Sequence, residues 1–436
     1  MKSEIENLKQ KMQSVNAAFP LSENTDILFK PINCGGLELN NRIALQPMEG
    51  CDGTFEGAPD ELTFARYKRF AEGGAALICL EAVAVLPQGR ANPRQLHINE
   101  NTLDEFKRLI DCIKSDSLNK TGYEAKVIMQ ATHSGRYSKP NGKPEPIIAY
   151  NNPIFEKDNP IDKSRIVSDD DLRRLEEAYG KATRLAEKAG FDGIDIKSCH
   201  RYLVSELLSA YDRPGEYGGS FENRTRLLRN GIAQAKNACS KNFVVTSRLN
   251  VYDGFPYPYG FGVKQDGSLA PDLDEPVKLV KMLCNDCGFK MLNITIGNPY
   301  VNPHVNRPYD QGGYVPAESP LTGVARMMHC VGTIKKAVPE LCIIGSGFSY
   351  PKELSANLAA GALEEGVCDI AGFGREAFAY PDFVNDLKTT GKMDKKKCCI
   401  TCGKCTELMR MGTVTGCVIR NPYYTELYKK MKEAVK

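Results

Sequence analysis

Gly193-Ile-Asp-Ile-Lys-Ser-Cys-His-Arg-Tyr202 is the stretch of this chain that says most about its fold. A short apolar strand ends here, and Lys197, His200 and Tyr202 stand at and after its carboxyl end. In a parallel barrel, the carboxyl ends of the strands form the catalytic face. Two hydrogen-bond donors in that place can polarise the carbonyl group of a substrate, and a phenol can supply a proton to one of its carbon atoms.

Short apolar runs alternate with longer amphipathic segments along the rest of the chain, which is typical of βα units and a parallel sheet. The expected strands are residues 43–47, 76–81, 127–133, 193–197, 243–249, 291–297, 341–347 and 368–374. The expected helices are residues 61–71, 102–115, 169–189, 222–238, 275–287, 323–338, 351–360 and 376–387. Eight strand–helix units favour closure, so we predict an α/β fold of the (β/α)8 TIM-barrel type over a doubly wound open sheet.

The two ends of the chain do not follow this pattern. We expect a polar helical extension over residues 1–25, the barrel over 26–392, and a small cysteine-rich C-terminal extension with a final helix over 393–436. The length of 436 residues suits a barrel with insertions, and an apolar content of 42% supports a large core.

Charge and composition exclude several classes of function. The net charge is +3 and no long block of Lys and Arg occurs, so we expect no nucleic-acid partner. No apolar run reaches the roughly 18 residues of a membrane span, and the polar start lacks a signal peptide, so we expect a cytoplasmic protein. Most of the 16 cysteines stand singly in apolar segments, as Cys330 and Cys342 do. We expect these to be buried free thiols and no disulfide framework.

Glycine-rich turns follow the last two expected strands, at Gly345-Ser-Gly-Phe348 and Gly372-Phe-Gly-Arg-Glu376. In barrels, the loops after strands seven and eight often hold a phosphate. Glycine lets backbone N–H groups approach the phosphate, and Arg375 can add a forked contact. Either glycine-rich turn alone fits an ordinary tight turn as well as it fits a phosphate site. Together they predict a phosphate site at Gly345, Gly347, Gly374 and Arg375.

Two further motifs carry a resemblance to a known family. Asn41-Arg-Ile-Ala-Leu-Gln-Pro-Met48 resembles the first strand of the old yellow enzyme family of flavin-dependent alkene reductases, and Gln130-Ala-Thr-His-Ser-Gly-Arg136 is similar to its Gln-Leu-x-His-x-Gly-Arg motif. The resemblance covers residues 28–382 and implies FMN as cofactor. The residues that it places beside the flavin are Pro47, Met48, Ala82, Gln130 and Arg248. Glu49 departs from the family, which often has Thr, Cys or Gly there; a carboxylate against the ring opposes flavin reduction.

The resemblance implies transfer of a hydride from reduced FMN to the β-carbon of an α,β-unsaturated carbonyl compound. Lys197 and His200 are expected to bind the carbonyl or carboxylate oxygen, and Tyr202 to protonate the α-carbon. Lys197 replaces the His that usually opens this motif, and a similar Lys-x-Cys-His-Arg-Tyr occurs in relatives that reduce steroids and bile acids. With aromatic loops nearby, a steroid, a bile acid or an aromatic enoate is the expected substrate. The structural alternatives are a Lys197 ion pair with Asp195 or Glu206, a structural His200, and a Tyr202 packed under its loop.

Four cysteines in the C-terminal extension have the spacing of a metal site. Cys399, Cys402 and Cys405 are closely spaced, and Cys417 follows after eleven residues, while the adjacent Cys398 is expected to be a bystander. Such thiolates can enclose an iron–sulfur cluster or a zinc ion. The chain resembles 2,4-dienoyl-CoA reductase and trimethylamine dehydrogenase in this region, which implies a [4Fe–4S] cluster; zinc is the alternative.

The resemblance leaves the electron donor and the class of reaction open. No Gly-x-Gly-x-x-Gly follows a late strand, so we expect electrons from NAD(P)H reacting at FMN, or from a separate flavoprotein or ferredoxin. The long loops allow a homo-oligomer contact as well as a substrate pocket. The alternative functions are an amine dehydrogenase or demethylase of the trimethylamine dehydrogenase type, which needs no acid such as Tyr202, and an electron-transfer subunit.

Overall fold

The computed structural model describes residues 2–310 and 312–434. A parallel sheet lies at its centre, with strand order β7-β6-β5-β4-β3-β11-β10-β9-β8. The strands are β3 (Ile43–Leu45), β4 (Leu77–Ala84), β5 (Lys126–Thr132), β6 (Gly193–Ile196), β7 (Val244–Thr246), β8 (Arg248–Asn250), β9 (Met291–Thr295), β10 (Cys342–Gly345) and β11 (Ile370–Phe373).

The two edge strands of this sheet belong to one segment of chain, because only Ser247 separates β7 from β8. β7 pairs with β6 and β8 pairs with β9, and the Ser247 carbonyl accepts a hydrogen bond from the Asn293 N–H at 3.0 Å. The sheet is thereby closed into an eight-position barrel, as the alternation of apolar and amphipathic segments predicted. The expected strand 243–249 is divided at Ser247, where the chain changes its pairing partner.

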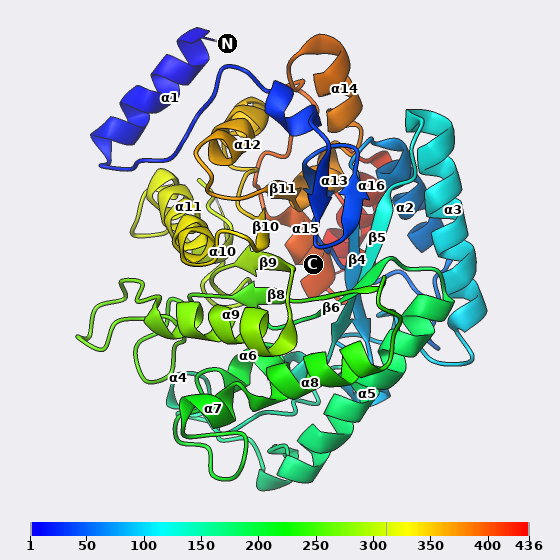
Figure 1. Ribbon diagram of the computed structural model, residues 1–436, viewed down its shortest axis with the longest axis vertical. Helices are drawn as coiled ribbons and strands as arrows, with labels where there is room; N and C mark the ends of the chain where they lie inside the picture. Colours follow the sequence, from blue (N-terminus) through cyan, green and yellow to red (C-terminus); the bar gives the residue numbers. More distant parts are fainter. Residues whose placement is uncertain (1, 311, 435–436) are drawn as a thin grey trace.

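Helices surround the barrel (Figure 1). The α-helices are α1 (Lys2–Ser14), α2 (Glu61–Glu72), α3 (Leu103–Thr121), α4 (Pro153–Glu156), α5 (Asp169–Lys188), α6 (Leu203–Leu207), α7 (Phe221–Arg224), α8 (Arg226–Asn237), α9 (Asp274–Cys287), α10 (Pro303–Asn306), α11 (Pro320–Ala337), α12 (Ser355–Glu364), α13 (Arg375–Ala379), α14 (Phe383–Thr390), α15 (Lys404–Arg410) and α16 (Pro422–Ala434). Short 3-10 helices occupy Asp26–Phe29, Pro87–Gly89, Gly135–Tyr137, Lys163–Arg165 and Lys352–Leu354.

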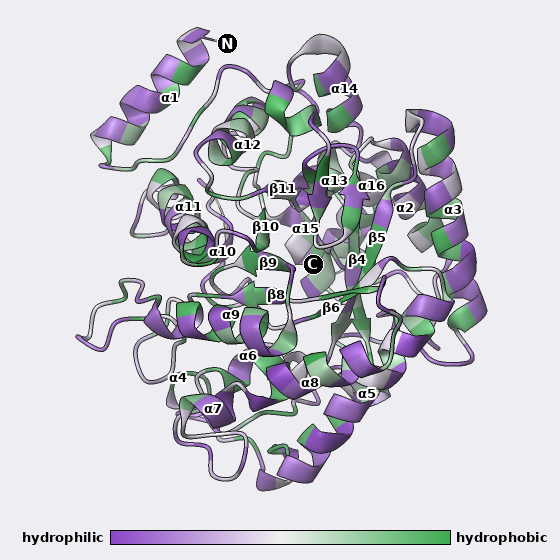
Figure 2. Cartoon of the chain, viewed as in Figure 1, coloured by the Kyte–Doolittle hydropathy of each residue, from purple (hydrophilic) through white to green (hydrophobic). Residues whose placement is uncertain are grey.

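The helix boundaries follow local chemistry. Ser168 and Asp171 exchange side-chain-to-backbone hydrogen bonds at the start of α5, which satisfies N–H groups that the first turn leaves free. The expected helix 376–387 is instead broken between α13 and α14, because Pro381 cannot donate the next helical hydrogen bond. In Figure 2, hydrophilic residues lie along α3 and α5, while the strands inside are mostly hydrophobic.

A two-stranded hairpin that the apolar pattern did not predict precedes the barrel. Its strands are β1 (Ile32–Cys34) and β2 (Leu37–Leu39), joined by a turn that two consecutive glycines with positive φ make possible. The hairpin packs against the first residues of the barrel strands and closes their amino end. Cys34 forms a disulfide with Cys342 of β10, with their Cα atoms 5.5 Å apart. The expectation that Cys342 is a free thiol is therefore wrong, since the hairpin brings a distant cysteine beside it.

The helices of residues 2–310 and 312–434 include none with both the length and the apolar character required to cross a membrane.

Candidate functional site

One cavity opens at the carboxyl ends of the strands, and all eight strand positions of the barrel contribute to it. Parallel strands place their last residues on one rim, so side chains that are distant in sequence meet there. Lys197, His200 and Tyr202 all line this cavity. So do eight of the expected cofactor residues, which are Pro47, Met48, Ala82, Gln130, Arg248, Gly347, Gly374 and Arg375.

Gly345 is the one expected cofactor residue that does not face the cavity. It lies inside β10, where an added Cβ would meet the side chains of Cys368 and Phe348 in the barrel wall. Its carbonyl accepts a hydrogen bond from Gln46 Nε2 at 3.2 Å, and the next residue, Ser346, lines the cavity instead. The residue that faces the cavity is thus one position later than expected, because successive strand residues point to opposite faces.

Lys197, Glu49 and Tyr202 form a compact polar cluster in the cavity. The Tyr202 hydroxyl donates to Glu49 Oε1 at 3.1 Å, and Lys197 Nζ lies 3.6 Å from the same oxygen. Lys197 Nζ also lies 3.5 Å from the centre of the Tyr202 ring, a cation–π contact. Asp195 and Glu206, the partners considered for Lys197 in the sequence, are bound instead by Gln130 and by Arg136, each at 2.8 Å.

Burial and nearby charge set the protonation of this cluster. Burial and the Glu49 carboxylate raise the pKa of Tyr202 well above its usual value, so the phenol keeps its proton. Burial and the cations Arg248 and Lys197 lower the pKa of His200 well below its usual value, so the imidazole is neutral and has one N–H to donate. Burial lowers the pKa of Lys197, and the Glu49 charge opposes that shift.

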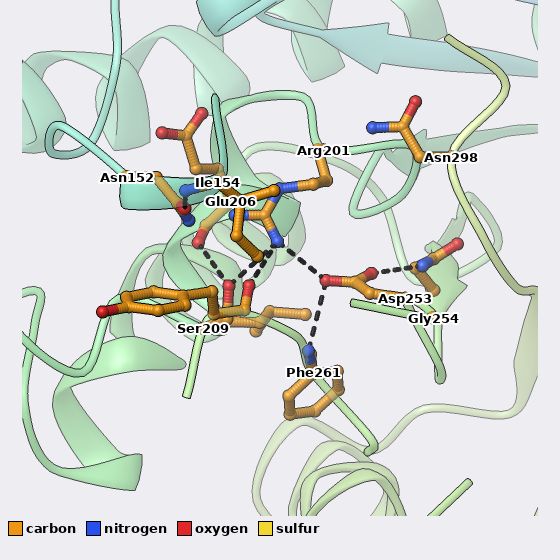
Figure 3. A network of polar contacts seen from close by, with 12 residues as sticks. Asn152, Ile154, Arg201, Glu206, Ser209, Asp253, Gly254, Phe261 and Asn298 are labelled. Atoms are coloured by element: carbon orange, nitrogen blue, oxygen red, sulfur yellow. Dashed lines mark hydrogen bonds and ion pairs between the residues drawn. The ribbon is translucent and has the colours of Figure 1, made fainter. Parts of the chain in front are cut away.

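His200 and the following Arg201 adopt left-handed backbone conformations, with φ of 63° and 56°. Residues with side chains rarely do so, and such strain persists only where the surroundings enforce it. The fully buried Arg201 guanidinium does this: it donates to Asp253 Oδ2 at 3.0 Å and Ser209 Oγ at 3.1 Å. Figure 3 shows the Arg201 side chain between these two partners. The network fixes the turn that presents His200 and Tyr202 to the cavity.

Two further tyrosines extend the aromatic side of the site. The Tyr300 hydroxyl lies 2.8 Å from that of Tyr202, and its ring stacks on Tyr137 with centroids 3.9 Å apart. Asn298 donates to the Tyr137 hydroxyl at 2.8 Å and accepts from the Tyr300 N–H at 2.8 Å. The sequence indicated aromatic loops near the site without singling out either tyrosine. For Tyr137, its place directly after the Gln130–Arg136 motif was the available signal.

Three arginines line the cavity without an ion pair among residues 2–310 and 312–434: Arg248, Arg307 and Arg375. Arg248 Nε and Arg375 Nη1 are buried and have no hydrogen-bond partner in the described chain. Buried donor atoms without a partner are costly, so this donor set fits an anionic group such as a phosphate. Sequence reasoning missed Arg307, which follows α10 in a loop that carried no recognisable motif.

The four expected metal ligands, Cys399, Cys402, Cys405 and Cys417, line a second and smaller pocket. Cys405 and Arg375 line both pockets, so the two are adjacent. In the described residues, no three His, Cys, Asp or Glu side chains lie close enough together to hold a single metal ion. Cys398 also lines the pocket, but its thiol donates to the Asp394 carbonyl.

Known proteins resemble this chain over much of its length. It is 29% identical to an NADPH dehydrogenase of Clostridium acetobutylicum over 54% of this chain and 66% of that protein. It is 26% identical to a cinnamate reductase of Clostridium sporogenes over 91% of this chain and 58% of that one. A bilirubin reductase of Mediterraneibacter gnavus is also 26% identical, over 90% and 56%. The chain thus spans little more than half the length of the last two.

Solved structures show the same fold at low identity. A 2-naphthoyl-CoA reductase has a TM-score of 0.73 at 20% identity, covering 93% of this chain and 58% of that one. A histamine dehydrogenase of Rhizobium sp. 4-9 has a TM-score of 0.68 at 22% identity, over 92% and 53%. An old yellow enzyme homologue of Zymomonas mobilis has a TM-score of 0.62 at 22% identity, over 85% and 94%.

The family comparison covers more than half of the chain. The model of the NADH:flavin oxidoreductase / NADH oxidase family matches residues 27–260, from before the first barrel strand to the loop after β8. Since the match includes the strand ends that carry Lys197, His200, Tyr202 and Arg248, the chain belongs to the NADH:flavin oxidoreductase / NADH oxidase family.

Proposed function

We propose that this protein is an FMN-dependent ene-reductase that acts on an α,β-unsaturated carbonyl compound. One observation carries the proposal: Tyr202, a buried phenol that keeps its proton, stands beside the Lys197 ammonium at the open end of the barrel. Such a pair can stabilise negative charge on an oxygen and deliver a proton to carbon. The relatives named cinnamate reductase and bilirubin reductase support an enoate or a conjugated ring compound as substrate.

Each residue of the cluster has a role in this reaction. Bound FMN supplies the hydride. Lys197 and the neutral His200 bind the carbonyl or carboxylate oxygen of the substrate, and hold the negative charge that develops there as the β-carbon is reduced. The Tyr202 hydroxyl gives its proton to the α-carbon. The phenolate that remains is stabilised by Lys197, whose Nζ lies 3.5 Å from the ring centre.

The residues around the cavity also fit the flavin. Gln130 donates one amide hydrogen to Asp195, which leaves its carbonyl oxygen for the pyrimidine edge. Arg248 brings a positive charge that favours the anionic reduced flavin, and Arg375 with Gly347 and Gly374 suits the phosphate. For the second pocket we propose a [4Fe–4S] cluster on Cys399, Cys402, Cys405 and Cys417, which all line it; a zinc ion is the alternative.

The charges in the cavity favour alkene reduction over the alternative of amine oxidation. Glu49 and the rings of Tyr137, Tyr202 and Tyr300 would otherwise be a good environment for a substrate ammonium. Lys197 already occupies this environment, with its Nζ 3.6 Å from Glu49. A second cation would be repelled there. The likeness to histamine dehydrogenase is at 22% identity and shows the fold alone.

The decisive experiment is an anaerobic single turnover. The FMN-loaded protein is reduced with dithionite and mixed with cinnamate in heavy water. We expect the flavin absorbance to return and one deuterium to appear at the α-carbon of the product. Tyr202→Phe should slow this step by about 100-fold or more, whereas Tyr179→Phe, which removes a buried hydroxyl without a hydrogen-bond partner on α5, should not.

Two outcomes would contradict the proposal. If Tyr202→Phe turns over like the unaltered protein, Tyr202 is not the acid. If reduced protein reacts with no enone or enoate but passes electrons to a ferredoxin or a flavoprotein, the chain is an electron-transfer subunit. Comparing NADH, NADPH and a reduced ferredoxin as reductants of the FMN then identifies the electron donor.

A further inference from the structure

The proposed reaction consumes the Tyr202 proton once in each turnover, so the phenol must receive a new proton before the next one. Tyr202 is only 2% exposed, although it lines the cavity. In residues 2–310 and 312–434 its hydroxyl has two hydrogen-bond partners, which are Glu49 Oε1 at 3.1 Å and the Tyr300 hydroxyl at 2.8 Å. These two groups are the candidates for the path by which a proton returns to Tyr202.

The hydrogen bonds around the Tyr202 hydroxyl have a defined direction. A phenol carries one proton to donate, and its oxygen can also accept. Glu49 Oε1 lies 3.6 Å from the Lys197 ammonium, and a carboxylate only accepts hydrogen bonds. Since Tyr202 donates its single proton to Glu49, the contact of 2.8 Å requires the Tyr300 hydroxyl to donate to the Tyr202 oxygen.

Tyr300 is therefore the neighbour that has a proton to give. The Glu49 carboxylate has none. Lys197 faces the ring of Tyr202, with Nζ 3.5 Å from its centre, and no hydrogen bond joins Nζ to the Tyr202 oxygen in the described chain. Burial and the Glu49 charge raise the pKa of Tyr300 well above its usual value, so its hydroxyl keeps its proton until a phenolate forms beside it.

Tyr300 also connects the buried phenol with the surface of the molecule. It lies in the loop between β9 and α10 and is partly exposed, and the next residue, Val301, is 45% exposed. Stacking on Tyr137, with ring centroids 3.9 Å apart, fixes its ring, and the Asn298 side chain accepts from its N–H at 2.8 Å. The fixed ring keeps the two hydroxyls in contact, while the partial exposure of Tyr300 lets water reach it.

We propose that Tyr300 returns a proton from solvent to Tyr202 after each turnover. Once Tyr202 has protonated the α-carbon, the O–H bond of Tyr300 breaks and a new O–H bond forms on the Tyr202 oxygen. The Tyr300 phenolate then takes a proton from water, which leaves hydroxide in solution, and neither step transfers electrons. The inference rests on the proposed function, because it takes Tyr202 to be the acid. It adds a residue that acts on the substrate only through Tyr202.

The origin of the α-proton tests this path. Reduced, FMN-loaded protein in ordinary water is mixed with saturating cinnamate in an excess of heavy water, and the product of the first turnover is analysed by mass spectrometry. In the unaltered protein Tyr300 exchanges the Tyr202 proton with solvent, so we expect deuterium at the α-carbon. In Tyr300→Phe the original Tyr202 proton should be transferred instead, and the deuterium content should fall several-fold. A loss of packing alone would slow the reaction without changing the isotope.

Repeated turnover gives a second measurement. With excess dithionite and cinnamate, Tyr300→Phe should complete its first turnover less than about 10-fold more slowly than the unaltered protein, because one neutral hydrogen bond is lost. Its later turnovers should be slower than the first, because each must wait for a proton. The rate at which dithionite reduces the FMN in the absence of cinnamate shows whether that reduction limits the later turnovers.

Tyr309→Phe is the matched control. Tyr309 is a buried tyrosine in the same connection between β9 and α11 and does not line the cavity, so this variant should incorporate deuterium like the unaltered protein. If Tyr300→Phe does so too, with later turnovers as fast as the first, the inference is wrong. It is also wrong if Glu49→Gln, and not Tyr300→Phe, gives the unlabelled product, because the proton then returns through Glu49. If reduced protein reacts with no enone or enoate, the proposed function fails and this inference falls with it.

Discussion

Lys197 is held between the Glu49 carboxylate and the face of the Tyr202 ring. Burial lowers its pKa below the usual lysine value near 10.4. Lysine is charged below its pKa, so the ammonium loses its charge at a lower pH than a free lysine does. We therefore expect single-turnover reduction of cinnamate to slow as the pH rises through that lowered pKa. Lys197→Arg should remove this alkaline loss, because arginine stays charged; an unchanged pH profile would exclude Lys197 as the charged donor.

Substitution of Glu49 gives an independent test, in which the alkaline loss of activity should move to lower pH. Its charge is the main effect that opposes the downward shift of the Lys197 pKa. Glu49→Gln removes that charge and keeps the shape of the side chain, so we expect the alkaline loss of activity to begin at a lower pH than in the unaltered protein. The same single-turnover pH profile measures it. A shift to higher pH would show that another group controls the reaction.

The sequence predicted some of these residues and could not predict their pairing. Lys197, His200 and Tyr202 follow one another at the end of a single strand, so the local pattern was enough to group them. Glu49 and Tyr202 are 153 positions apart, and no local pattern indicates that they meet. Lys197 lies beside Glu49 and not beside Asp195 or Glu206, because Gln130 and Arg136 bind those two carboxylates. Only the folded chain shows these pairings.

At the scale of elements, the turn after β6 depends on a buried ion pair. Arg201 and Asp253 come from the loops after neighbouring strand positions, and both are almost completely buried. Asp253→Asn would leave the guanidinium buried without a counter-charge, which costs about 3–5 kcal/mol. We expect a loss of that size in the free energy of unfolding, measured with urea. Asp212→Asn, at an exposed position, should change it by less than about 0.5 kcal/mol.

An Asp253→Asn variant as stable as the control would show that water or another group satisfies Arg201. If the variant is destabilised but still folded, its remaining activity reports on the turn itself. We expect slower proton delivery at unchanged riboflavin affinity, because Tyr202 follows Arg201 directly, while Gln130 and Arg248 belong to β5 and β8.

Elements with a strong hydrophobic period were predictable, and short or interrupted ones were not. All eight strand positions and the long helices α5 and α9 lie close to their expected ranges, and α3 starts as expected but continues to Thr121. The hairpin of β1 and β2 was missed because three-residue strands carry too little periodicity. The division of the strand at Ser247 was missed for another reason: it depends on the exchange of partners that closes the barrel, which a pattern along the chain does not contain.

At the scale of the whole molecule, the C-terminal segment returns to the barrel mouth. Thr406 and Met409 of α15, and Thr415 after it, line the main cavity, and the Thr415 N–H donates to the Gly50 carbonyl at 2.7 Å. The segment that carries the cysteines is thus also a wall of the candidate active site. A metal cluster held there would lie next to the flavin, as electron transfer between them requires.

This arrangement leads to a prediction about metal content. Cys417 and Cys398 both line the small pocket, but only Cys417 fits the spacing of the expected ligands. We expect the anaerobically purified protein to contain about four iron and four sulfide per chain. Cys417→Ser should lose most of both, whereas Cys398→Ser should keep them, because the Cys398 thiol is directed to the Asp394 carbonyl. Elemental analysis and a sulfide assay measure both quantities.

The control variant makes the outcome specific. Serine in place of a cysteine preserves the size of the side chain, so a loss of iron confined to Cys417→Ser identifies a ligand rather than a general loosening of the segment. Equal losses of iron in both variants would mean that the pocket tolerates no substitution of its cysteines. One zinc per chain in the unaltered protein would exclude the cluster.

Because Cys405 and Arg375 border both pockets, loss of the cluster should also weaken FMN binding. If FMN affinity is unchanged, the two pockets are independent and the segment serves only as a wall.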